Sequence, residues 1–346
     1  MPAETGVAAA AEMETDGASS GRISSLPILL LNVHEHCNCR CLMCDIWKRK
    51  DGKELDLAEF ARHRDSLLQL GVREVVLTGG EPLLHSNFAG LSDFLKGCGV
   101  RITLLTTGLL LARRAEILAR AVDEIIVSID GPEEIHDQVR RVKGAYRLIE
   151  DGIREVTRIK SGIVFRGRCT IQKANHLRLR RTVEVAKALG LGSISFLAAD
   201  ASSQAFNREL VWPGERQNQI MLTKTEVEGL EAEVDALVAE QAAEIRAGYI
   251  RESESKLRRI VRRFHEHLGE FEPAAPICNA PWVSAVLEVD GSLRPCFFHG
   301  KIGNAHASTL ERALNSEDAV RFRSSLKVSE NATCRRCVCS LNYSSP

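Results

Sequence analysis

The 346-residue sequence predicts an α/β protein built on a parallel β-sheet, followed by a small cysteine-rich α+β region. Two observations carry this prediction. From residue 28 to about residue 200, short apolar segments alternate with amphipathic segments of helical period, which is the pattern of repeated β-α units. The eleven cysteines, in contrast, gather in one short segment near residue 40 and in the last quarter of the chain.

The composition narrows the class of protein. A hydrophobic fraction of 44% and a charged fraction of 27% are ordinary for a globular protein. Lys and Arg number 46, as do Asp and Glu, so the chain lacks the basic excess of a general nucleic-acid binder and no nucleic-acid partner is expected. The longest apolar run, residues 26–31, is far shorter than the ~20 residues that a membrane span needs, so no span is expected.

Residues 1–22 are predicted to be a disordered tail. Residues 1–21 contain four acidic residues, many Ala and Gly, and no Lys or Arg. This matches neither a secretory signal, which has a basic start and an apolar stretch, nor an Arg-rich transit peptide. We therefore expect a cytoplasmic protein. In that reducing compartment, clustered cysteines indicate metal or iron–sulfur ligation rather than disulfides.

Residues 23–222 are predicted to form the first domain. Its strands are expected at residues 28–33, 74–78, 102–106, 124–130, 164–172 and 193–198. Val, Ile and Leu on both faces are typical of strands covered by helices. Helices are expected at residues 57–70, 88–95, 113–121, 145–159 and 179–189. Right-handed crossovers make this a parallel sheet, either doubly wound or curled into a partial barrel, and the periodicity does not decide between the two.

Residues 223–271 are predicted to be a helical linker. Thr223 and Glu226 form a capping box at the start of one helix, and Gly248 is expected to follow its end. A second helix has a basic face made of Lys256, Arg258, Arg259, Arg262 and Arg263. This face is either a site for an acidic peptide or phosphate, or simply solvent-exposed. We favour the exposed face, because Glu252 and Glu254 each stand four residues before a basic side chain.

Residues 272–346 are predicted to form a second, smaller domain. Two short strands, residues 286–289 and 292–294, flank Asp290-Gly291, a strong hairpin signal. Helices are expected near residues 309–315 and 318–326. So few apolar residues make a core too small to be stable alone, and a bound metal would stabilise it.

The first chemical motif is Cys37, Cys41 and Cys44, spaced C-x3-C-x2-C immediately after the first predicted strand. Three thiolates on one loop hold three irons of a cubane and leave the fourth open for chemistry, whereas sites with four thiolates are structural or only transfer electrons. The alternative is a zinc knuckle that uses Cys39 as the fourth ligand. The spacing favours iron–sulfur.

These cysteines, followed by Asp45-Ile46-Trp47, resemble the cluster loop of the radical S-adenosylmethionine (SAM) superfamily. The resemblance extends to a glycine pair after the second strand, in a segment that binds the amino group of SAM in that family. It also extends to a Ser-x-Asp-Gly segment after the fourth strand, which contacts the ribose and the carboxylate. The SAM contacts that it implies are Gly79, Gly80, Glu81, Pro82, Ser128 and Asp130.

Physical reasoning agrees with these roles. Two glycines allow a backbone to approach a ligand closely, and a carboxylate suits an ammonium group. Strand alternation puts Ser128 and Asp130 on one face. All three motifs follow parallel strands, at the edge where such sheets bind ligands. The alternative is a strand-exit turn and a helix cap. The resemblance covers residues 28–200 and implies a partial (β/α)6 barrel.

The sequence departs from the family pattern at three places. Met43 stands where an aromatic residue is common, and Met also fills gaps near a flat ring. Arg140-Arg141 stands where Arg-Gly is common, which leaves the role of Arg140 open. The resemblance assigns no role to Cys39.

The second motif is Cys278, Cys296, Cys334 and Cys337, with intervals of 17, 37 and 2 residues. It resembles the twitch domain, the shortened form of the SPASM extension of radical SAM enzymes, and implies one auxiliary [4Fe–4S] cluster. Cys339 is a spare thiol and an alternative to Cys337. A structural zinc ribbon with the same four ligands is the other interpretation.

Some polar residues are weaker candidates. Asn32, His34 and His36 share a face where the first strand enters the cysteine loop, and Arg166, Arg168, Thr170 and Gln172 share a face of the fifth strand. They are interpreted as cofactor or core contacts. His265 and His267 are expected to be solvated. No general base is assigned.

The resemblance implies an oxidoreductase. Reductive cleavage of SAM gives methionine and a 5′-deoxyadenosyl radical, the radical abstracts a substrate hydrogen, and the auxiliary cluster takes the second electron. An external electron donor such as flavodoxin or ferredoxin is implied. Similar two-domain enzymes act on amino sugars and cyclitols or on ribosomal peptides. A peptide maturase would usually need a leader-binding element, which residues 1–22 do not supply, so a small-molecule substrate is favoured. A non-enzymatic zinc protein is the remote alternative.

Overall fold

The structure, a computed structural model, describes residues 20–49, 52–206, 208 and 210–344. The predicted tail therefore lies outside the described residues except for residues 20–22. These three lead into a contact with the C-terminal region, where the Arg323 side chain donates a 2.7 Å hydrogen bond to the Gly21 carbonyl. Ile23 is tied there as well, since its N–H donates to Asn315 Oδ1 at 2.9 Å.

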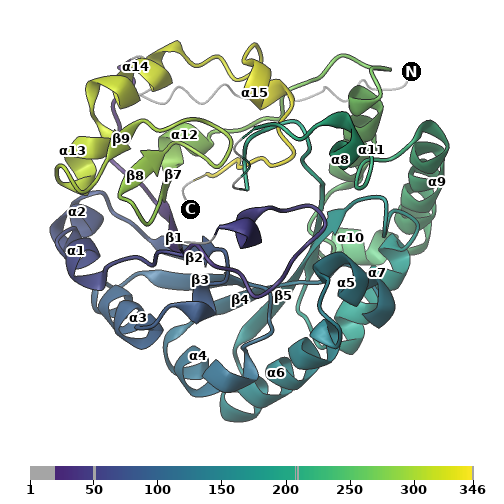
Figure 1. The fold of residues 1–346 in the computed structure, drawn as a ribbon, viewed down its shortest axis with the longest axis horizontal. Coiled ribbons are helices and arrows are strands. Elements are labelled where there is room, and N and C mark those ends of the chain that lie inside the picture. Colours follow the sequence, from purple (N-terminus) through teal and green to yellow (C-terminus); the bar gives the residue numbers. More distant parts are fainter. Residues whose placement is uncertain (1–19, 50–51, 207, 209, 345–346) are drawn as a thin grey trace, which may run out of the picture.

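One sheet of nine strands organises the described chain (Figure 1). The strands are β1 (Ile28–His34), β2 (Glu74–Gly79), β3 (Arg101–Thr106), β4 (Glu124–Ser128), β5 (Val164–Ile171), β6 (Ile194–Ala198), β7 (Ser284–Leu287), β8 (Ser292–Arg294) and β9 (Gly303–Asn304). From β1 to β6 they pair in parallel and in chain order. A doubly wound sheet would reverse its direction at one strand. The continuous order therefore confirms the partial barrel.

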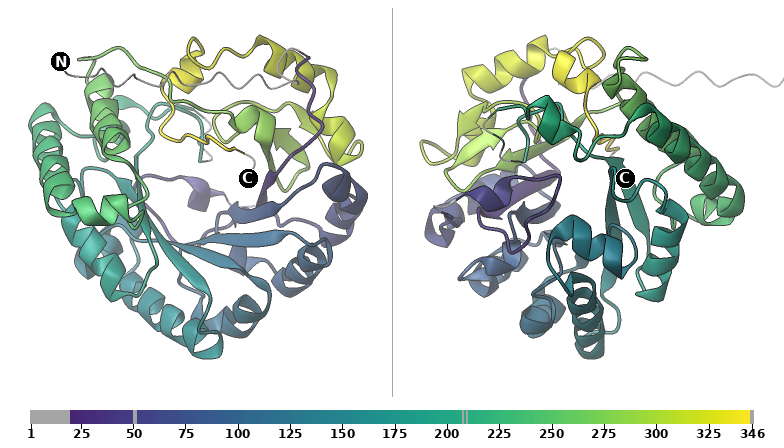
Figure 2. Two further views of the ribbon diagram at one scale, coloured as in Figure 1. Left: turned by 180° about the vertical axis from the view of Figure 1, so that it is seen from behind. Right: turned by 45° about the vertical axis from the view of Figure 1, so that its right-hand side comes forward.

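Helices cover the outer face of this curved sheet (Figures 1 and 2). Those of the barrel are α1 (Leu57–Ala61), α2 (Arg64–Gln69), α3 (Phe88–Gly97), α4 (Ala115–Ala121), α5 (Glu133–Arg140), α6 (Ala145–Ile159) and α7 (Leu179–Ala188), with short 3-10 turns η1 (Ile46–Lys48), η2 (Pro82–Leu84) and η3 (Ala112–Arg114). The periodicity predicts one helix over residues 57–70, but the structure divides it at His63. It does not predict α5, which is only two turns long.

The sheet has a covered face and an open face. In β5, Phe165, Cys169 and Ile171 are buried against helices, while Arg166, Arg168 and Thr170 are partly exposed on the other side. The expectation that both faces are covered by helices is therefore wrong for the barrel. Its concave face is open because strands that curl inward present that side to the interior.

The linker region packs outside the barrel. It consists of α8 (Gly214–Gln217), α9 (Lys224–Glu240), α10 (Ala242–Arg246) and α11 (Glu254–His267). The capping box is present at the start of α9, with the Thr223 side chain accepting from the Glu226 N–H and the Glu226 carboxylate accepting from the Thr223 N–H. The helix expected to run up to Gly248 ends at Glu240, and Gly248 instead follows the short α10, with a φ of +73° that glycine adopts readily.

The interpretation of the basic face of α11 as solvent-exposed is wrong in part. Arg263 is buried and donates a 2.6 Å hydrogen bond to the Arg336 carbonyl, and Arg259 donates to the Cys337 carbonyl at 3.5 Å. His265 and His267 are partly buried rather than solvated, and His265 Nδ1 lies 2.6 Å from a Glu270 oxygen. The reason is that the C-terminal cysteine segment, far away in sequence, packs on this face.

The C-terminal region extends the barrel sheet. β7 pairs in parallel with β1, with Ile28 opposite Ser284 and Leu31 opposite Leu287, and β8 and β9 follow in antiparallel order. The predicted hairpin is thus confirmed, with the addition that it continues the sheet. The remaining helices are α12 (Ala280–Val283), α13 (Leu310–Leu314), α14 (Glu317–Ser325) and α15 (Ala332–Arg335). Figure 1 shows this region above the open side of the barrel.

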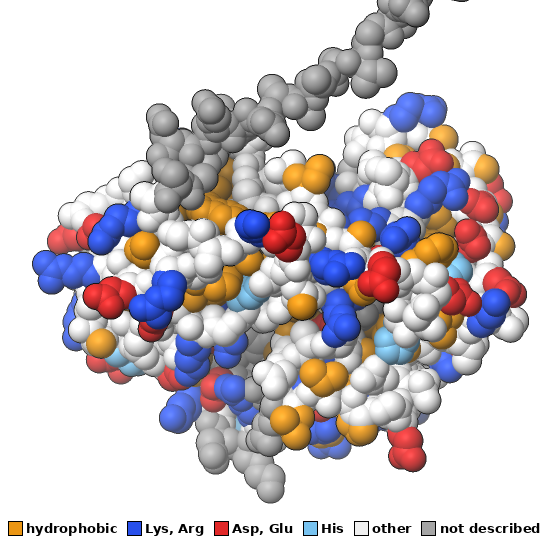
Figure 3. All heavy atoms as spheres, turned by 90° about the horizontal axis from the view of Figure 1, so that it is seen from above, with side chains coloured by type: hydrophobic (Ala, Val, Ile, Leu, Met, Phe, Trp, Pro, Cys, Tyr) orange, Lys and Arg blue, Asp and Glu red, His pale blue; other side chains and the backbone are white. Residues whose placement is uncertain are grey.

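Charged side chains of both signs lie on the surface (Figure 3), as expected from the equal numbers of basic and acidic residues in the sequence. Basic and acidic side chains are interspersed over the face seen from above (Figure 3). Within the described residues, no helix combines the length and the apolar character that a bilayer crossing requires.

Arg141 occupies a position that suits glycine, and this leads to a stability prediction. It ends α5 in the left-handed conformation, with φ 54° and ψ 39°, and its side chain is exposed. We expect Arg141→Gly to raise the free energy of unfolding by about 1 kcal/mol, because only glycine adopts this conformation without a Cβ penalty. Urea unfolding measures the change. Arg141→Ala is the matched control and should not stabilise, so a gain in the alanine variant would identify removal of the charge as the cause.

Candidate functional site

The loop that carries Cys37, Cys39, Cys41 and Cys44 lies across the carboxyl ends of the strands. We call residues 35–45 the cysteine loop. It is held from two sides by backbone hydrogen bonds. On one side the N–H groups of Gly80 and Glu81 donate to the carbonyls of His34 and His36, both at 2.7 Å. On the other, the N–H groups at positions 40 and 42 donate to the carbonyls at positions 140 and 139 of α5, at 3.1 and 3.0 Å.

The thiols of the cysteine loop lie close enough to influence one another. The pKa of Cys41 is lowered, first by a hydrogen bond from Cys39 and then, against the effect of burial, by the charge of Arg140. Burial raises the pKa of Cys44 to about 12, and the charges of Cys41 and Cys37 raise it further. The structure therefore brings together the three predicted ligands, with Cys39 buried among them.

Gly79 and Gly80 are required by the close approach of β2 to the cysteine loop. A Cβ at Gly80 would lie 2.0 Å from the His36 carbonyl oxygen, and one at Gly79 would lie 2.5 Å from the His34 oxygen. Gly79 also has a φ of +130°. The sequence predicts that these glycines let the backbone approach SAM, and that contact stays a prediction; the approach that the structure shows is the one to the cysteine loop.

This contact predicts the effect of a single methyl group. Gly80→Ala should lower the free energy of unfolding of the metal-free protein by about 3 kcal/mol, the upper end for overpacking, because the obstructing atom is backbone. It should also reduce the iron content after reconstitution. Gly97→Ala is the control, since its Cβ would meet only the Arg64 side chain, at 3.7 Å. Equal stability of the two variants in urea would contradict the prediction.

Glu81 is fully buried and joins the ends of β2 and β3. Its carboxylate accepts from the N–H groups of Leu83 and Thr107, at 3.0 and 2.7 Å, and from the hydroxyls of Thr106 and Thr107. Burial raises its pKa above the ordinary value, although these hydrogen bonds oppose the change. Both oxygens thus have partners within the protein. A contact of Glu81 or Pro82 with SAM stays a prediction.

Ser128 and Asp130 lie at the end of β4, but their surroundings differ. Ser128 is partly exposed toward the barrel interior, whereas Asp130 has no exposed surface. One Asp130 oxygen lies 2.6 Å from Arg140 Nε, and the other accepts from the Thr170 N–H at 3.3 Å. The neighbouring His136 ring accepts from the Asp130 N–H at 3.3 Å, and burial lowers its pKa to about 4, so it is neutral.

A segment after β6 covers the cysteine loop, which the sequence did not indicate. The Trp212 indole N–H donates to the Asp45 carboxylate at 2.8 Å. The guanidinium groups of Arg208 and Arg216 flank the indole ring, each 4.4 Å from its centroid. Arg216 also donates to the Leu42 carbonyl at 2.6 Å. Asp45 directly follows Cys44, so this contact holds the end of the cysteine loop.

The same segment reaches the C-terminal region. The Phe206 ring lies 6.5 Å from that of Phe297 and 6.1 Å from that of Phe298, the two residues after Cys296. Trp212 thus contacts the residue after Cys44, and Phe206 contacts the two residues after Cys296.

The four predicted C-terminal ligands come together from three separate segments. Burial raises the pKa of Cys296 and Cys334 to about 11, and the proximity of Cys278 adds to both shifts. Burial also raises the pKa of Cys337, with contributions from Cys339 and, more weakly, from Cys296 and Cys278. Cys339 is exposed. Cys337 thus lies near Cys278, Cys296 and Cys339, and its choice over Cys339 as the fourth ligand stays a prediction.

Both groups of thiols suit iron–sulfur clusters in their donor sets. All eleven cysteines are free, so none is committed to a disulfide. Three thiols on one loop match a cubane with one open iron, and four thiols match a fully ligated cubane. Within the described residues, no three His, Cys, Asp or Glu side chains are arranged to hold a single metal ion.

Two family models match this arrangement. Residues 31–167 match the radical SAM superfamily, and residues 278–338 match SPASM, an iron–sulfur cluster-binding domain. The chain contains a radical SAM domain and a SPASM domain. A radical SAM domain binds SAM and a [4Fe–4S] cluster, and a SPASM domain binds auxiliary iron–sulfur. The expected family and cofactors are thereby confirmed.

Several curated proteins are similar to part of this chain. The AdoMet-dependent heme synthase of Methanosarcina barkeri is 32% identical over 159 residues, which cover 44% of this chain and 45% of that protein. The GTP 3′,8-cyclase of Peptoclostridium acidaminophilum is 33% identical over 136 residues, which cover 37% and 41%. The chain thus spans less than half the length of each of these relatives.

Solved structures resemble the whole fold. The crystal structure of Streptococcus suis SuiB bound to S-adenosylmethionine has a TM-score of 0.64 at 14% identity, covering 94% of this chain and 75% of that one. Native anSMEcpe with bound AdoMet has a TM-score of 0.66 at 18% identity, covering 90% and 86%. At these identities the likeness shows the fold.

The weaker candidate residues take varied positions in the radical SAM barrel. Asn32 donates to Glu288 just after β7, and His34 lies 4.0 Å from Glu54. Gln172 is buried, and its amide donates to the Met43 sulfur at 3.5 Å. Arg166 pairs with Glu124 at 2.8 Å. These contacts join strands or support the cysteine loop.

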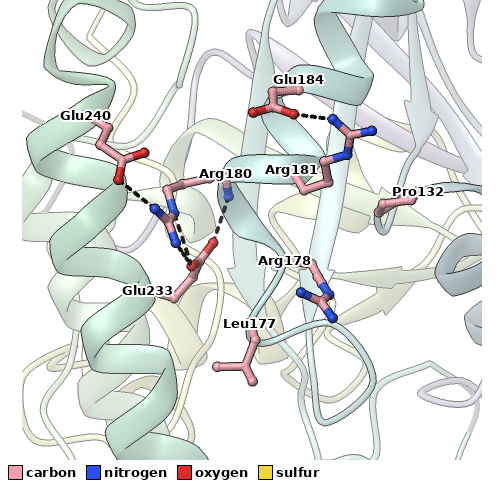
Figure 4. A pocket seen from close by; sticks show the side chains of 8 residues that line it. All are labelled: Pro132, Leu177, Arg178, Arg180, Arg181, Glu184, Glu233 and Glu240. Carbon is pink, nitrogen blue, oxygen red and sulfur yellow. Dashed lines mark hydrogen bonds and ion pairs between the residues drawn. The ribbon is translucent and has the colours of Figure 1, made fainter.

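A cavity of about 440 Å³ lies away from the cysteines, between α7 and α9 (Figure 4). Its central side chain, Arg180, is held by Glu233 at 2.9 Å and by Glu240 at 2.6 Å. A third pair, Arg181 with Glu184, lies on its wall. These ion pairs join two helices of the barrel exterior, so the cavity is not part of the radical SAM site.

Proposed function

We propose that this radical SAM protein is an oxidoreductase of a small polar molecule, such as an amino sugar or a cyclitol. SAM bound at the Cys37, Cys41 and Cys44 cluster would supply a 5′-deoxyadenosyl radical on one-electron reduction. The observation that carries the proposal is the convergence of Cys278, Cys296, Cys334 and Cys337. A second cluster there, ligated by the protein on every iron, suits electron transfer rather than SAM binding.

The oxidation balances with these two centres. In the conversion of an alcohol to a ketone, the substrate would give its carbon-bound hydrogen to the 5′-deoxyadenosyl radical, forming 5′-deoxyadenosine, and would release one proton to solvent or a base. The remaining electron would pass to the auxiliary cluster that Cys278, Cys296, Cys334 and Cys337 would hold, as the carbonyl forms. The reducing equivalent that starts the cycle comes from an external donor, which we propose to be a flavodoxin or ferredoxin in the cytoplasm.

The barrel interior supports a polar substrate. Arg168 and Ser128 stand opposite each other on β5 and β4, and both are partly exposed on the concave face. The Arg168 guanidinium donates to Ser195 at 3.3 Å, and among the described residues no carboxylate pairs with it. A hydroxyl-rich or anionic group of a substrate would find donors here. The curated relatives named for heme synthesis and GTP cyclisation also support a small molecule.

The remaining predicted SAM contacts retain their assigned roles within the proposal. Gly79 and Gly80 would present backbone to the methionine part of SAM, together with Glu81 and Pro82. Ser128 would bind directly, since it is partly exposed, while the buried Asp130 would act from behind it. The segment with Trp212 would help to exclude water from the radical, which reacts with whatever lies nearest.

Anaerobic reconstitution tests the proposal. The full chain should bind about eight irons, two cubanes, and should form 5′-deoxyadenosine from SAM with dithionite. Candidate substrates deuterated at the reacting carbon should then transfer deuterium to 5′-deoxyadenosine and yield a product lighter by two hydrogens. The panel contains amino sugars, cyclitols, nucleotides, tetrapyrroles and peptides. Zinc in place of iron, or a product that is not oxidised relative to the substrate, would contradict the proposal that the protein is an oxidoreductase.

A further inference from the structure

Arg140 connects the end of β4 to a cluster ligand. Its Nε lies 2.6 Å from an Asp130 oxygen, and its Nη1 donates to the Cys41 sulfur at 3.5 Å. All three side chains are buried, with 8% of the Arg140 side chain and none of the Asp130 side chain exposed. The guanidinium is therefore fixed between a carboxylate and a thiol, with little access for water.

Attachment of the cysteine loop does not by itself explain this contact. Backbone hydrogen bonds from positions 40 and 42 already fasten the loop to α5. A buried ion pair is a costly way to add stability, because apolar side chains of similar volume often do as well or better. What the pair adds is a permanently charged N–H group that points at one particular sulfur.

We infer that Arg140 is a positioning residue that sets the reduction potential of the cluster on Cys37, Cys41 and Cys44, and that Asp130 moderates its effect. This inference rests on the proposed function. Reduction adds one electron, supplied by dithionite in the assay, to the cluster and its thiolates. A positive N–H donor at a cluster sulfur stabilises the more negative state and raises the potential. Asp130 holds the Arg140 guanidinium in place. Its own negative charge partly cancels the effect of the positive charge on the reduction potential.

The two members of the pair therefore act in opposite directions. Arg140→Gln should make the cluster harder to reduce, with a roughly tenfold lower ratio of reduced to oxidised cluster at a fixed potential, equivalent to 59 mV for one electron. Asp130→Asn keeps the shape of the side chain but removes its negative charge, and it should make the cluster easier to reduce. Arg140→Lys keeps the charge, so its shift should be smaller than that of the glutamine variant.

Potentiometric titration followed by electron paramagnetic resonance measures these shifts in the full, reconstituted chain without SAM. The signal that disappears in Cys41→Ala is assigned to the catalytic cluster, which separates it from the auxiliary one. Arg147→Gln is the matched control, because Arg147 pairs with Glu133 on the exposed surface, and it should cause no shift. Iron content shows whether each variant is loaded.

The outcomes separate this inference from the proposed function. If the native chain has no reducible cluster that depends on Cys41, the proposed function fails. If the cluster is present but Arg140→Gln leaves its potential unchanged, or if Arg140→Gln and Asp130→Asn shift it in the same direction, the inference is wrong. Should Arg140→Gln not retain iron, the sign of the Asp130→Asn shift decides alone, and an unchanged or lowered potential overturns the inference.

Discussion

We expect Cys41→Ala to abolish the formation of 5′-deoxyadenosine from SAM under dithionite. Cys41 is the second of the three predicted ligands, its sulfur is buried, and its pKa is lowered by a hydrogen bond from Cys39 and by the charge of Arg140. The thiolate is the form that binds metal. With two thiolates instead of three, the cubane loses a protein ligand at a second iron, and the single open iron that SAM requires is no longer defined. High-performance liquid chromatography of the reaction measures the product.

Cys39→Ala is the matched control for this variant. Cys39 is buried like Cys41 and lies on the same loop, but the C-x3-C-x2-C spacing of Cys37, Cys41 and Cys44 does not include it. The alanine variant should therefore retain most of the activity. An inactive Cys39 variant together with an active Cys41 variant would show that the ligands have been assigned wrongly.

The strands and the chemical motifs could be predicted because their signals are local. The six strands of the barrel occur within two residues of their expected ends, since apolar runs bounded by turns report on burial directly. The hairpin around Gly291 and the capping box at Thr223 were equally accessible, because each depends on residues only a few positions apart. The choice between a barrel and a doubly wound sheet came from the motifs and was confirmed by the strand order.

The contacts that the sequence could not give all join distant segments. β7 pairs with β1 across more than 250 residues, and nothing in either strand identifies the other as its partner. The basic face of α11 resembles any solvated helix until the C-terminal segment packs on Arg263. In the same way, Trp212 and its partner Asp45 lie 167 residues apart, and neither residue type identifies the other. The neighbouring sequence indicates whether such a residue is buried or exposed, but it does not identify the distant residue that it contacts.

Glu81 shows the same limit at the site itself. The family resemblance implied that Glu81 contacts SAM, and a carboxylate after a glycine pair suits an ammonium group. The structure shows donors from the end of β3 around both oxygens, a role in strand connection that residue type alone does not reveal. Arg140 is the opposite case. The sequence left its role open, and the contact with Cys41 supplies one.

The second prediction concerns the auxiliary cluster. A triple variant with Ala at positions 37, 41 and 44 should still bind about four irons per chain, the content of one cubane, and should remain folded. Cys278, Cys296 and Cys334 come from three segments, so without metal no local structure holds their sulfurs together. Metal binding there contributes to the folding free energy, and chelation of the remaining iron should lower the melting temperature of this variant.

A second variant, which lacks two auxiliary ligands, and the iron content of both variants test whether the auxiliary cluster is separate and redox-active. Ala at both Cys296 and Cys334 should leave about four irons and the formation of 5′-deoxyadenosine, while the two-electron oxidation of substrate should stop, because the substrate radical has lost its electron acceptor. Loss of all iron in the triple variant would contradict a separate auxiliary site, and zinc in its place would contradict a redox role. About eight irons would instead show a second auxiliary cluster and a full SPASM domain. In that case the exposed Cys339, next to Cys337, is the thiol to replace next, since it is the one C-terminal cysteine that a single cubane leaves without a role.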